Sequence, residues 1–252
     1  MSQNLYDKKF FGDIDHGSRA SAVTILSALK RYLEPRSVVD IGCGAGSWVR
    51  SAQQVFAMEA ACVTGVDGEY AKAFHHDLGG HFVYADLAKS INLPQQFDLA
   101  ICLEVVEHLP NARAATFVDD LCRLSNVVLF SAAVPRQCGT GHIKEQWPEF
   151  WMNEFSRNDY LMFDLIRPEI WNDGSVGPWY AQNCFVFVRR TEIALVDRLK
   201  HSQLGAGDWR MRLVHPGILN IAACETAGAS RLVRALPGRI VTSFARRFAR
   251  AT

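Results

Sequence analysis

Seven short apolar runs constrain the fold of this chain more than any other feature. The first five are SVVDI, CVTGV, HFVYA, FDLAICL and NVVLFSAA, and the segments between them are long enough for helices. This alternation is typical of a parallel β-sheet with helical connections. The last two runs, YLMFDLI and NCFVFV, have only a turn-rich stretch between them, so we expect them to pair antiparallel. The pattern predicts an α/β fold.

The length of the chain sets the number of domains. With 252 residues, 49% of them hydrophobic, it can form one sizeable core and an appendage. A first helix is predicted over residues 18–33, where apolar residues recur at helical spacing and Pro35 follows. We therefore expect one α/β domain over residues 1–190 and a helical, basic tail over residues 191–252.

Charge is unevenly distributed along the chain. The formal net charge is +1, but six arginines and no acid follow Thr226, which leaves about −5 for the rest. The segment RIVTSFARRFAR, residues 239–250, drawn as a helix, has an apolar face and an arginine face. This pattern is typical of a helix on a membrane surface, and equally of one that docks on its own domain or on a second subunit. Nucleic acid is a less expected partner, because no aromatic residues interleave with the arginines on their face.

The cysteines and the first residues bear on location. Seven cysteines without a CxxC spacing indicate reduced thiols. The first residues are polar, and no apolar run reaches the roughly 18 residues that would span a bilayer. We expect a cytoplasmic protein, with peripheral contact at the inner membrane surface through the tail as a further expectation.

The segment VVDIGCGAGSW, residues 38–48, predicts a ligand-binding turn between a strand and a helix. Glycines at positions 42, 44 and 46 allow the backbone to turn sharply and to approach a ligand without a Cβ in the way. The spacing is GxGxG, preceded by Asp40, and differs from the GxGxxG of dinucleotide-binding folds. A glycine turn alone is equally consistent with a purely structural role.

Two more acids follow the next two predicted strands. Asp67 comes 21 residues after Gly46, where an acid can accept hydrogen bonds from both hydroxyls of a ribose. Asp86 follows the third strand, where it can meet an adenine amino group while Leu87 packs on the ring. Each acid alone is more often a helix cap. Three acids after three successive strands, beside the glycine turn, indicate a nucleoside ligand.

With these segments the chain resembles class I S-adenosylmethionine-dependent methyltransferases, over roughly residues 18–190. The matching segments are VVDIGCGAG, VTGVDGEY, YADL and FDLAICLEVVEHL. The resemblance implies a Rossmann-like, seven-stranded, mostly parallel sheet with a reversed last strand and helices on both faces. It also implies S-adenosylmethionine as cofactor, with its methionine end against the glycine turn.

The cofactor-binding residues predicted on this basis come from the four segments and from the start of the first helix. They are Asp40, Gly42, Cys43, Gly44, Gly46, Asp67, Asp86, Leu87, Leu103 and His16. His16 is included because it precedes the predicted helix together with Gly17 and Ser18, and a helix N-terminus suits the carboxylate of the cofactor.

The string LEVVEH gathers Glu104, Glu107 and His108 at the end of the fourth strand, and three accounts of it stay open. In the first it is a structural clasp, with Glu107 capping backbone amides. In the second it binds Mg²⁺, Mn²⁺ or Zn²⁺ together with His142, because EVVEH resembles the metal-binding segments of ubiquinone-pathway O-methyltransferases and small-RNA 2′-O-methyltransferases. In the third, His142 or His108 is a general base without a metal. The catalytic candidates are thus His142, His108 and Glu104.

Two aromatic segments are predicted to form a lid over the acceptor. QCGTGHIKEQWPEFW follows the fifth strand, and IWNDGSVGPWYAQN precedes the last. Arg136 and Lys144 are available for an anionic group on the acceptor. The predicted reaction is methyl transfer from S-adenosylmethionine to a hydroxyl or phosphate-like oxygen of a small molecule or of a sugar or glycan intermediate. The alternatives are an RNA 2′-O-methyltransferase and a catalytically silent scaffold that binds the cofactor.

Overall fold

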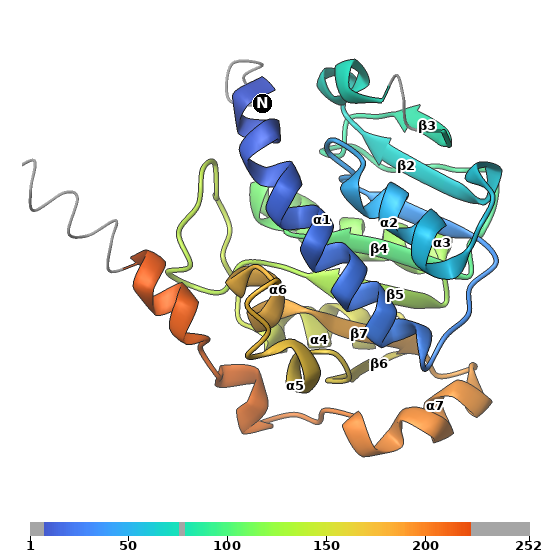
Figure 1. The fold of residues 1–252 in the computed structure, drawn as a ribbon. Helices are drawn as coiled ribbons and strands as arrows, with labels where there is room; N and C mark the ends of the chain where they lie inside the picture. The colour runs from blue at the N-terminus through green and yellow to red at the C-terminus, as the bar shows by residue number, and fades with distance from the viewer. Residues whose placement is uncertain (1–7, 76–78, 223–252) are drawn as a thin grey trace, which may run out of the picture.

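The computed structural model describes the backbone of residues 8–75 and 79–222, and the side chains from residue 18 onward within these ranges. Its centre is a seven-stranded sheet in the order β3-β2-β1-β4-β5-β7-β6 (Figure 1). The strands are β1 (Val38–Ile41), β2 (Val63–Asp67), β3 (His81–Tyr84), β4 (Leu99–Leu103), β5 (Val127–Ser131), β6 (Tyr160–Phe163) and β7 (Phe185–Arg189).

The strand directions confirm the sequence prediction. Strands β1 to β5 are parallel, whereas β7 lies between β5 and β6 and is antiparallel to both. The last strand along the chain is therefore the reversed one. The chain crosses back after β3 to place β4 beside β1. A crevice at the carboxyl ends of the strands is expected where the strand order reverses in this way.

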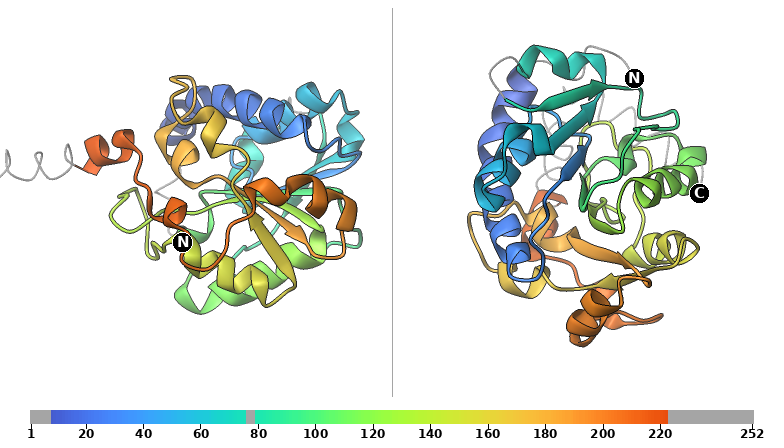
Figure 2. Two further views of the ribbon diagram at one scale, coloured as in Figure 1. Left: turned by 90° about the horizontal axis from the view of Figure 1, so that it is seen from below. Right: turned by 90° about the vertical axis from the view of Figure 1, so that its right-hand side faces the viewer.

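Helices cover both faces of the sheet (Figure 2). The labelled α-helices are α1 (Lys8–Lys30), α2 (Ser47–Phe56), α3 (Ala114–Leu124), α4 (Pro148–Ser156), α5 (Arg167–Ile170), α6 (Pro178–Asn183) and α7 (Ile193–Leu199), and residues 216–222 are also helical. The 3₁₀ segments are η1 (Ala60–Cys62), η2 (Glu69–Phe74), η3 (Val106–His108), η4 (Asn111–Arg113), η5 (Lys200–Ser202) and η6 (Trp209–Arg212).

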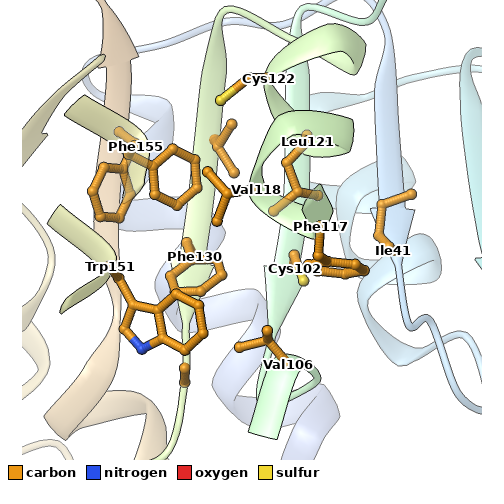
Figure 3. Packing of buried hydrophobic residues seen from close by; sticks show 14 of the residues in the cluster. Ile41, Cys102, Val106, Phe117, Val118, Leu121, Cys122, Phe130, Trp151 and Phe155 are labelled. Atoms are coloured by element: carbon orange, nitrogen blue, oxygen red, sulfur yellow. The ribbon is translucent and has the colours of Figure 1, made fainter. Parts of the chain in front are cut away.

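Alternation along the strands divides the core into two layers. On β4, Leu99, Ile101 and Leu103 pack with α1 and α2, and Ala100 and Cys102 pack with α3 on the other face. Successive side chains of a strand point to opposite faces, so an uninterrupted apolar run is what a strand covered on both sides requires. Figure 3 shows the α3 layer, where aromatic rings from β5 and α4 meet the helix.

Two local predictions were wrong. Helix α1 begins at Lys8, ten residues before the predicted start, because the helix continues through Gly17, which a helix tolerates at a cost of about 1 kcal/mol. The residues between β3 and β4 form no helix. There the Asp86 side chain accepts a hydrogen bond from the Ala88 N–H, and Pro94 follows, so the backbone turns early.

Residues 191–222 pack on the sheet domain. The backbone at the end of β6 bonds to the end of η5 and the residues after it, with Asp164 N–H donating to Ser202 O (2.8 Å) and Leu204 N–H donating to Met162 O (2.9 Å). The domain boundary at residue 190 stays a prediction. The basic segment 239–250 lies outside the described residues. Among the helices that the structure describes, none combines the length and apolarity needed to cross a membrane.

Candidate active site

A cavity of about 910 Å³ opens at the carboxyl ends of the parallel strands. Its walls are the glycine turn after β1, the ends of β2, β3 and β4, the loop 137–143 and helix α6. This is the edge where open α/β sheets bind ligands. The volume lies near the upper end of the range for small-molecule sites, so it has room for two ligands together.

The glycine turn is tied to the sheet and to the EVVEH string. Gly42, Gly44 and Gly46 all have positive φ angles, of 80°, 51° and 82°. A Cβ at Gly42 would lie 2.4 Å from Cγ2 of Val105, so only glycine lets the turn pack against that side chain. The N–H groups of Gly42 and Cys43 donate to the Val66 carbonyl at the end of β2. The first and fourth motifs of the sequence are thereby in contact.

Asp67 ends β2 with a carboxylate that is fully bonded. It accepts hydrogen bonds from the N–H groups of Gly44 and Gly68, each at 2.7 Å, and from the hydroxyl of Tyr70. Burial raises its pKa, and these three donors oppose that shift. The carboxylate lines the cavity and is held in one orientation, as a ribose-binding group requires.

Glu104 follows the last residue of β4 and has a strained backbone conformation. Its φ angle is +54°, in the left-handed region that costs a non-glycine residue about 1–3 kcal/mol. Its N–H donates to Ser131, and its carboxylate accepts from Gln137 Nε2 (2.6 Å) and Asn183 Nδ2 (3.2 Å). Burial raises the pKa of this carboxyl group, which these hydrogen bonds oppose. Three distant segments thus fix one carboxylate at the cavity wall.

Glu107 carries an unpartnered carboxylate. Its side chain is 0% exposed, and neither oxygen has a hydrogen-bond partner among the described residues. Burial and the neighbouring Glu104 carboxylate raise its pKa. Its backbone carbonyl accepts from the N–H groups of Ile143 and Lys144, which brings the loop after β5 onto this turn. A buried carboxylate without partners is costly, so this position requires a proton or a cation.

His108 and His142 complete a cluster with Glu107. One ligand atom from each of the three residues lies within 4.8 Å of the others, and the two imidazole rings meet edge to face with centroids 4.9 Å apart. His108 Nδ1 is buried without a partner among the described residues. Burial and His142 lower the pKa of His108 to about 4, so its ring is neutral at pH 7.

Glu145 orients the ring of His142. Its carboxylate lies 3.1 Å from His142 Nδ1 and also accepts from the N–H groups of Arg136 and Cys138. With Nδ1 donating to Glu145, Nε2 keeps its lone pair for a metal or a proton. Gly139 makes room for the ring, because a Cβ there would lie 2.3 Å from Nε2.

Comparison with known proteins decides the family. A family model described as a methyltransferase domain matches residues 16–161, more than half of the chain. The chain belongs to this methyltransferase family. Its class I architecture and its motifs make it an S-adenosylmethionine-dependent member, as the sequence predicted.

Individual relatives of this methyltransferase match over shorter stretches or at lower identity. Ubiquinone biosynthesis O-methyltransferases of Pseudomonas putida and Pseudomonas fluorescens are 37% identical over 87 residues, which cover 31% of this chain and 36% of each relative. The chain thus spans about a third of the length of these curated relatives.

Two solved structures share the fold of this methyltransferase. The methyltransferase domain of the bacterial protein CtHen1-C is 17% identical with a TM-score of 0.52, covering 68% of this chain and 98% of that one. Human N-acetylserotonin methyltransferase in complex with S-adenosylmethionine is 14% identical with a TM-score of 0.50, covering 75% of this chain and 56% of that one.

Most of the predicted cofactor residues line the cavity of this methyltransferase. They are Gly42, Cys43, Gly44, Asp67, Asp86, Leu87 and Leu103. Asp40 is buried below the turn, where burial and Asp67 raise its pKa, and Gly46 caps α2; neither is a lining residue. His16 lies inside α1, so the predicted helix end there was wrong, and its side chain is outside the described part.

The predictions for the acceptor side of the methyltransferase had mixed outcomes. Glu104, His108 and His142 line the cavity, and Glu107 lies directly behind them. The structural clasp stays a prediction for Glu107: the backbone N–H groups of Glu107 and Ala133 lie close enough to lower the pKa of its carboxyl group, but neither makes a hydrogen bond of standard geometry to it. Three of the four predicted metal ligands come together, while Glu104 is held by amide groups.

The two aromatic segments contribute unequally to the cavity wall. Trp179 and Tyr180 line it, whereas Trp151 packs in the core against Phe130. Arg136 and Lys144 are absent from the described lining, and Lys144 lies over the ring of Phe150.

Sequence reasoning missed several groups that hold the methyltransferase site together. They are Tyr70, His75, Gln137 and Glu145. Tyr70 lies at the end of the second motif, and Gln137 and Glu145 lie in the first aromatic segment, but their roles depend on hydrogen bonds that the sequence does not show. Glu145 had one available signal, since it follows His142 by three residues within a short loop.

Proposed function

We propose that this methyltransferase transfers the methyl group of S-adenosylmethionine to a hydroxyl oxygen of a neutral small molecule. The observation that carries this proposal is the buried, unpartnered Glu107 carboxylate at the end of β4, beside the imidazoles of His108 and His142. Such a donor set is suited to activating a hydroxyl group and has no purpose in binding the cofactor. The O-methyltransferase relatives are consistent with it.

A divalent cation fits the cluster of Glu107, His108 and His142. One carboxylate and two imidazoles are donors that Mn²⁺ and Zn²⁺ accept, and a cation would satisfy the Glu107 oxygens that lack partners. When bound, the cation would lower the pKa of the acceptor hydroxyl and stabilise the oxyanion. Glu145 would fix the His142 ring for this role, as carboxylates commonly do for metal-binding histidines.

The other residues of the site align the acceptor and remove its proton. The acceptor oxygen attacks the sulfonium methyl in line, the C–S bond breaks as the O–C bond forms, and the hydroxyl proton passes to the Glu104 carboxylate. Burial raises the pKa of Glu104, which makes it a better base than an exposed carboxylate. Alignment supplies about 7–11 kcal/mol in favourable cases, and proton removal adds about 10²–10⁴-fold.

The charge of the cavity favours a neutral acceptor over RNA. Four acids line the cavity, Asp67, Glu69, Asp86 and Glu104, and its described lining contains no lysine or arginine. Phosphate backbones are bound through lysines and arginines, so a polyanion would find no partner at this wall. On the acceptor side, Trp179, Ile143 and Ile221 add apolar surface, which suits the hydrocarbon or aromatic body of a small molecule.

The test is an acceptor screen that measures release of S-adenosylhomocysteine. A panel of neutral hydroxylated small molecules is compared with their phosphorylated analogues and with short RNAs, each with MnCl₂ and with a chelator. We expect turnover with neutral acceptors, a methoxy group in the product by NMR, and loss of turnover with the chelator. Methylation of RNA without methylation of neutral acceptors would overturn the proposal.

A Glu107→Gln variant tests cation binding independently of the acceptor. Wild-type protein in MnCl₂ at about ten times the dissociation constant should gain about 1.4 kcal/mol of stability, and the variant should gain none. Glu154→Gln is the control, because Glu154 lies on α4 and pairs with Arg157. An equal gain in all three proteins would show that the cation binds elsewhere.

A further inference from the structure

His75 is a buried imidazole between the glycine turn and β3 that the proposed chemistry does not use. It is 8% exposed and does not line the cavity. Its Nε2 lies 2.8 Å from the carbonyl oxygen of Gly44, and its Nδ1 lies 3.3 Å from the hydroxyl of Tyr84. Because a carbonyl only accepts, Nε2 carries the hydrogen, and in the neutral ring Nδ1 accepts from the Tyr84 hydroxyl.

The ring of His75 is fixed by stacking as well as by hydrogen bonds. It lies on the ring of Phe82 with centroids 3.9 Å apart and planes inclined by 20°. Phe82 in turn lies over Gly65 of β2, where a Cβ would be 2.7 Å from the ring. A layer from β2 and β3 therefore supports one face of the imidazole, and Cys43 Sγ lies 3.9 Å from its Nε2.

Gly44 is held from both sides as a result. Its N–H donates to Asp67 Oδ2 at 2.7 Å, and its carbonyl accepts from His75. Because the peptide unit is planar and trans, a carbonyl directed at His75 leaves the N–H of Ala45 directed to the opposite side. Ala45 lines the cavity, so the orientation of this peptide decides how the turn meets a ligand.

Tyr84, at the end of β3, connects the other ring nitrogen of His75, Nδ1, to the cavity wall. It is a lining residue two positions before Asp86, on the side predicted for the adenosine. We propose that His75 is a positioning residue for the cofactor, which couples the Gly44 carbonyl to the Tyr84 hydroxyl and so sets both walls of the adenosine and methionine sites. This proposal rests on the cofactor of the family and not on the acceptor or a cation.

A matched pair of variants tests the hydrogen bond from His75 Nε2 to the Gly44 carbonyl. The amide nitrogen of glutamine corresponds to Nε2 of histidine, whereas that of asparagine corresponds to Nδ1 and falls short of the Gly44 carbonyl. For S-adenosylhomocysteine measured by calorimetry, we expect His75→Asn to raise Kd about tenfold and His75→Gln to stay within about threefold of wild type. His81→Asn, at an exposed histidine of β3, is the control and should leave Kd unchanged.

Tyr84→Phe removes the hydroxyl that bonds to His75 Nδ1 and should raise Kd for S-adenosylhomocysteine about threefold. Circular dichroism should confirm that each variant is folded. The His75→Asn, Tyr84→Phe double variant should weaken binding by less than the product of the two single effects, because the two groups form one unit. Equal Kd values for His75→Asn, His75→Gln and wild type would overturn the proposal. If His75→Asn does not fold, a wild-type Kd for Tyr84→Phe would overturn it, and a raised Kd with a normal His75→Gln would support it.

Discussion

Asp67 and Glu107 are two buried carboxylates at the same edge of one sheet, and their surroundings differ. Asp67, in the cofactor half formed by β1, β2 and β3, is 3% exposed and accepts three hydrogen bonds from its own strand–turn region and the glycine turn. Glu107, in the acceptor half formed by the end of β4, the loop after β5 and α6, is 0% exposed, and its carboxylate has no partner in the described structure.

The difference indicates that the two halves are prepared in different ways. The Asp67 carboxylate of the cofactor half has its hydrogen bonds without a ligand, because backbone N–H groups and the Tyr70 hydroxyl donate to it. The acceptor half keeps a buried acid and a neutral His108 at a cost in stability, which a bound cation would recover. Changes in the first half should therefore affect folding and cofactor affinity, and changes in the second should affect pH and metal dependence.

The largest effect is expected from Gly42→Ala in the cofactor half. The φ angle of +80° and the 2.4 Å approach of a Cβ to Val105 add strain and overpacking, together about 4 kcal/mol of lost stability. Gly174→Ala, where a Cβ meets nothing within 4 Å, should change stability by less than about 0.5 kcal/mol. Urea denaturation of both variants makes the comparison, and a loss below about 1 kcal/mol for Gly42→Ala would contradict the packing described.

Acid should destabilise the acceptor half through His108. Its pKa falls from 6.5 to about 4 on folding, so between these pH values the unfolded chain holds a proton that the folded chain lacks. Stability contributed by this residue should fall by about 3 kcal/mol as the pH drops through that window. The raised pKa values of Asp40 and Glu107 act in the opposite direction, so the measurement is the difference between wild type and His108→Gln in chelator. A difference that does not vary with pH would refute this prediction.

Asp67→Asn should weaken cofactor binding more than Asp86→Asn. Losing a charged acceptor at a fixed, buried site costs about 2 kcal/mol, or about thirtyfold in Kd for S-adenosylhomocysteine. The side chain of Asp86 is 57% exposed, so its replacement should change Kd by less than about threefold. Calorimetry measures Kd for S-adenosylhomocysteine in both variants. A larger loss of affinity in Asp86→Asn than in Asp67→Asn would show that the adenine side contributes more to binding.

The smallest expected effect is that of Glu145→Gln on Mn²⁺ affinity. A carboxylate behind a metal-binding imidazole is worth about 10–100-fold, and the amide oxygen of glutamine keeps part of the hydrogen bonding, so we expect about tenfold. Cofactor affinity should not change, because Glu145 lies in the acceptor half. If Glu145→Gln binds Mn²⁺ as tightly as wild type while Glu107→Gln binds it more weakly, the cation site would stand and the proposed role of Glu145 would be wrong.

Much of the cofactor half could be predicted from the sequence. Its parts are local: a strand, a glycine turn and the start of a helix over residues 38–48, and an acid at or just past the end of each of the next two strands. Periodicity and turn chemistry act over such short distances, so the sequence could place Gly42, Asp67 and Asp86 at the cavity wall, and their contacts with the cofactor stay a prediction. The sequence did not show that α1 begins at Lys8 or that the residues between β3 and β4 form no helix, because local propensity does not fix where a helix begins or ends.

The sequence by itself determined the order of strands and turns, the acids at the strand ends and the presence of two glutamates and a histidine after β4. Only the tertiary structure decided which of these groups have partners. Gln137 and Asn183 reach Glu104 across 33 and 79 residues, Glu107 is left without a donor, and His75 connects Gly44 with Tyr84. Hydrogen bonds and burial depend on distances between side chains that are remote in the chain, and the packing of the sheet with its helices is what sets those distances.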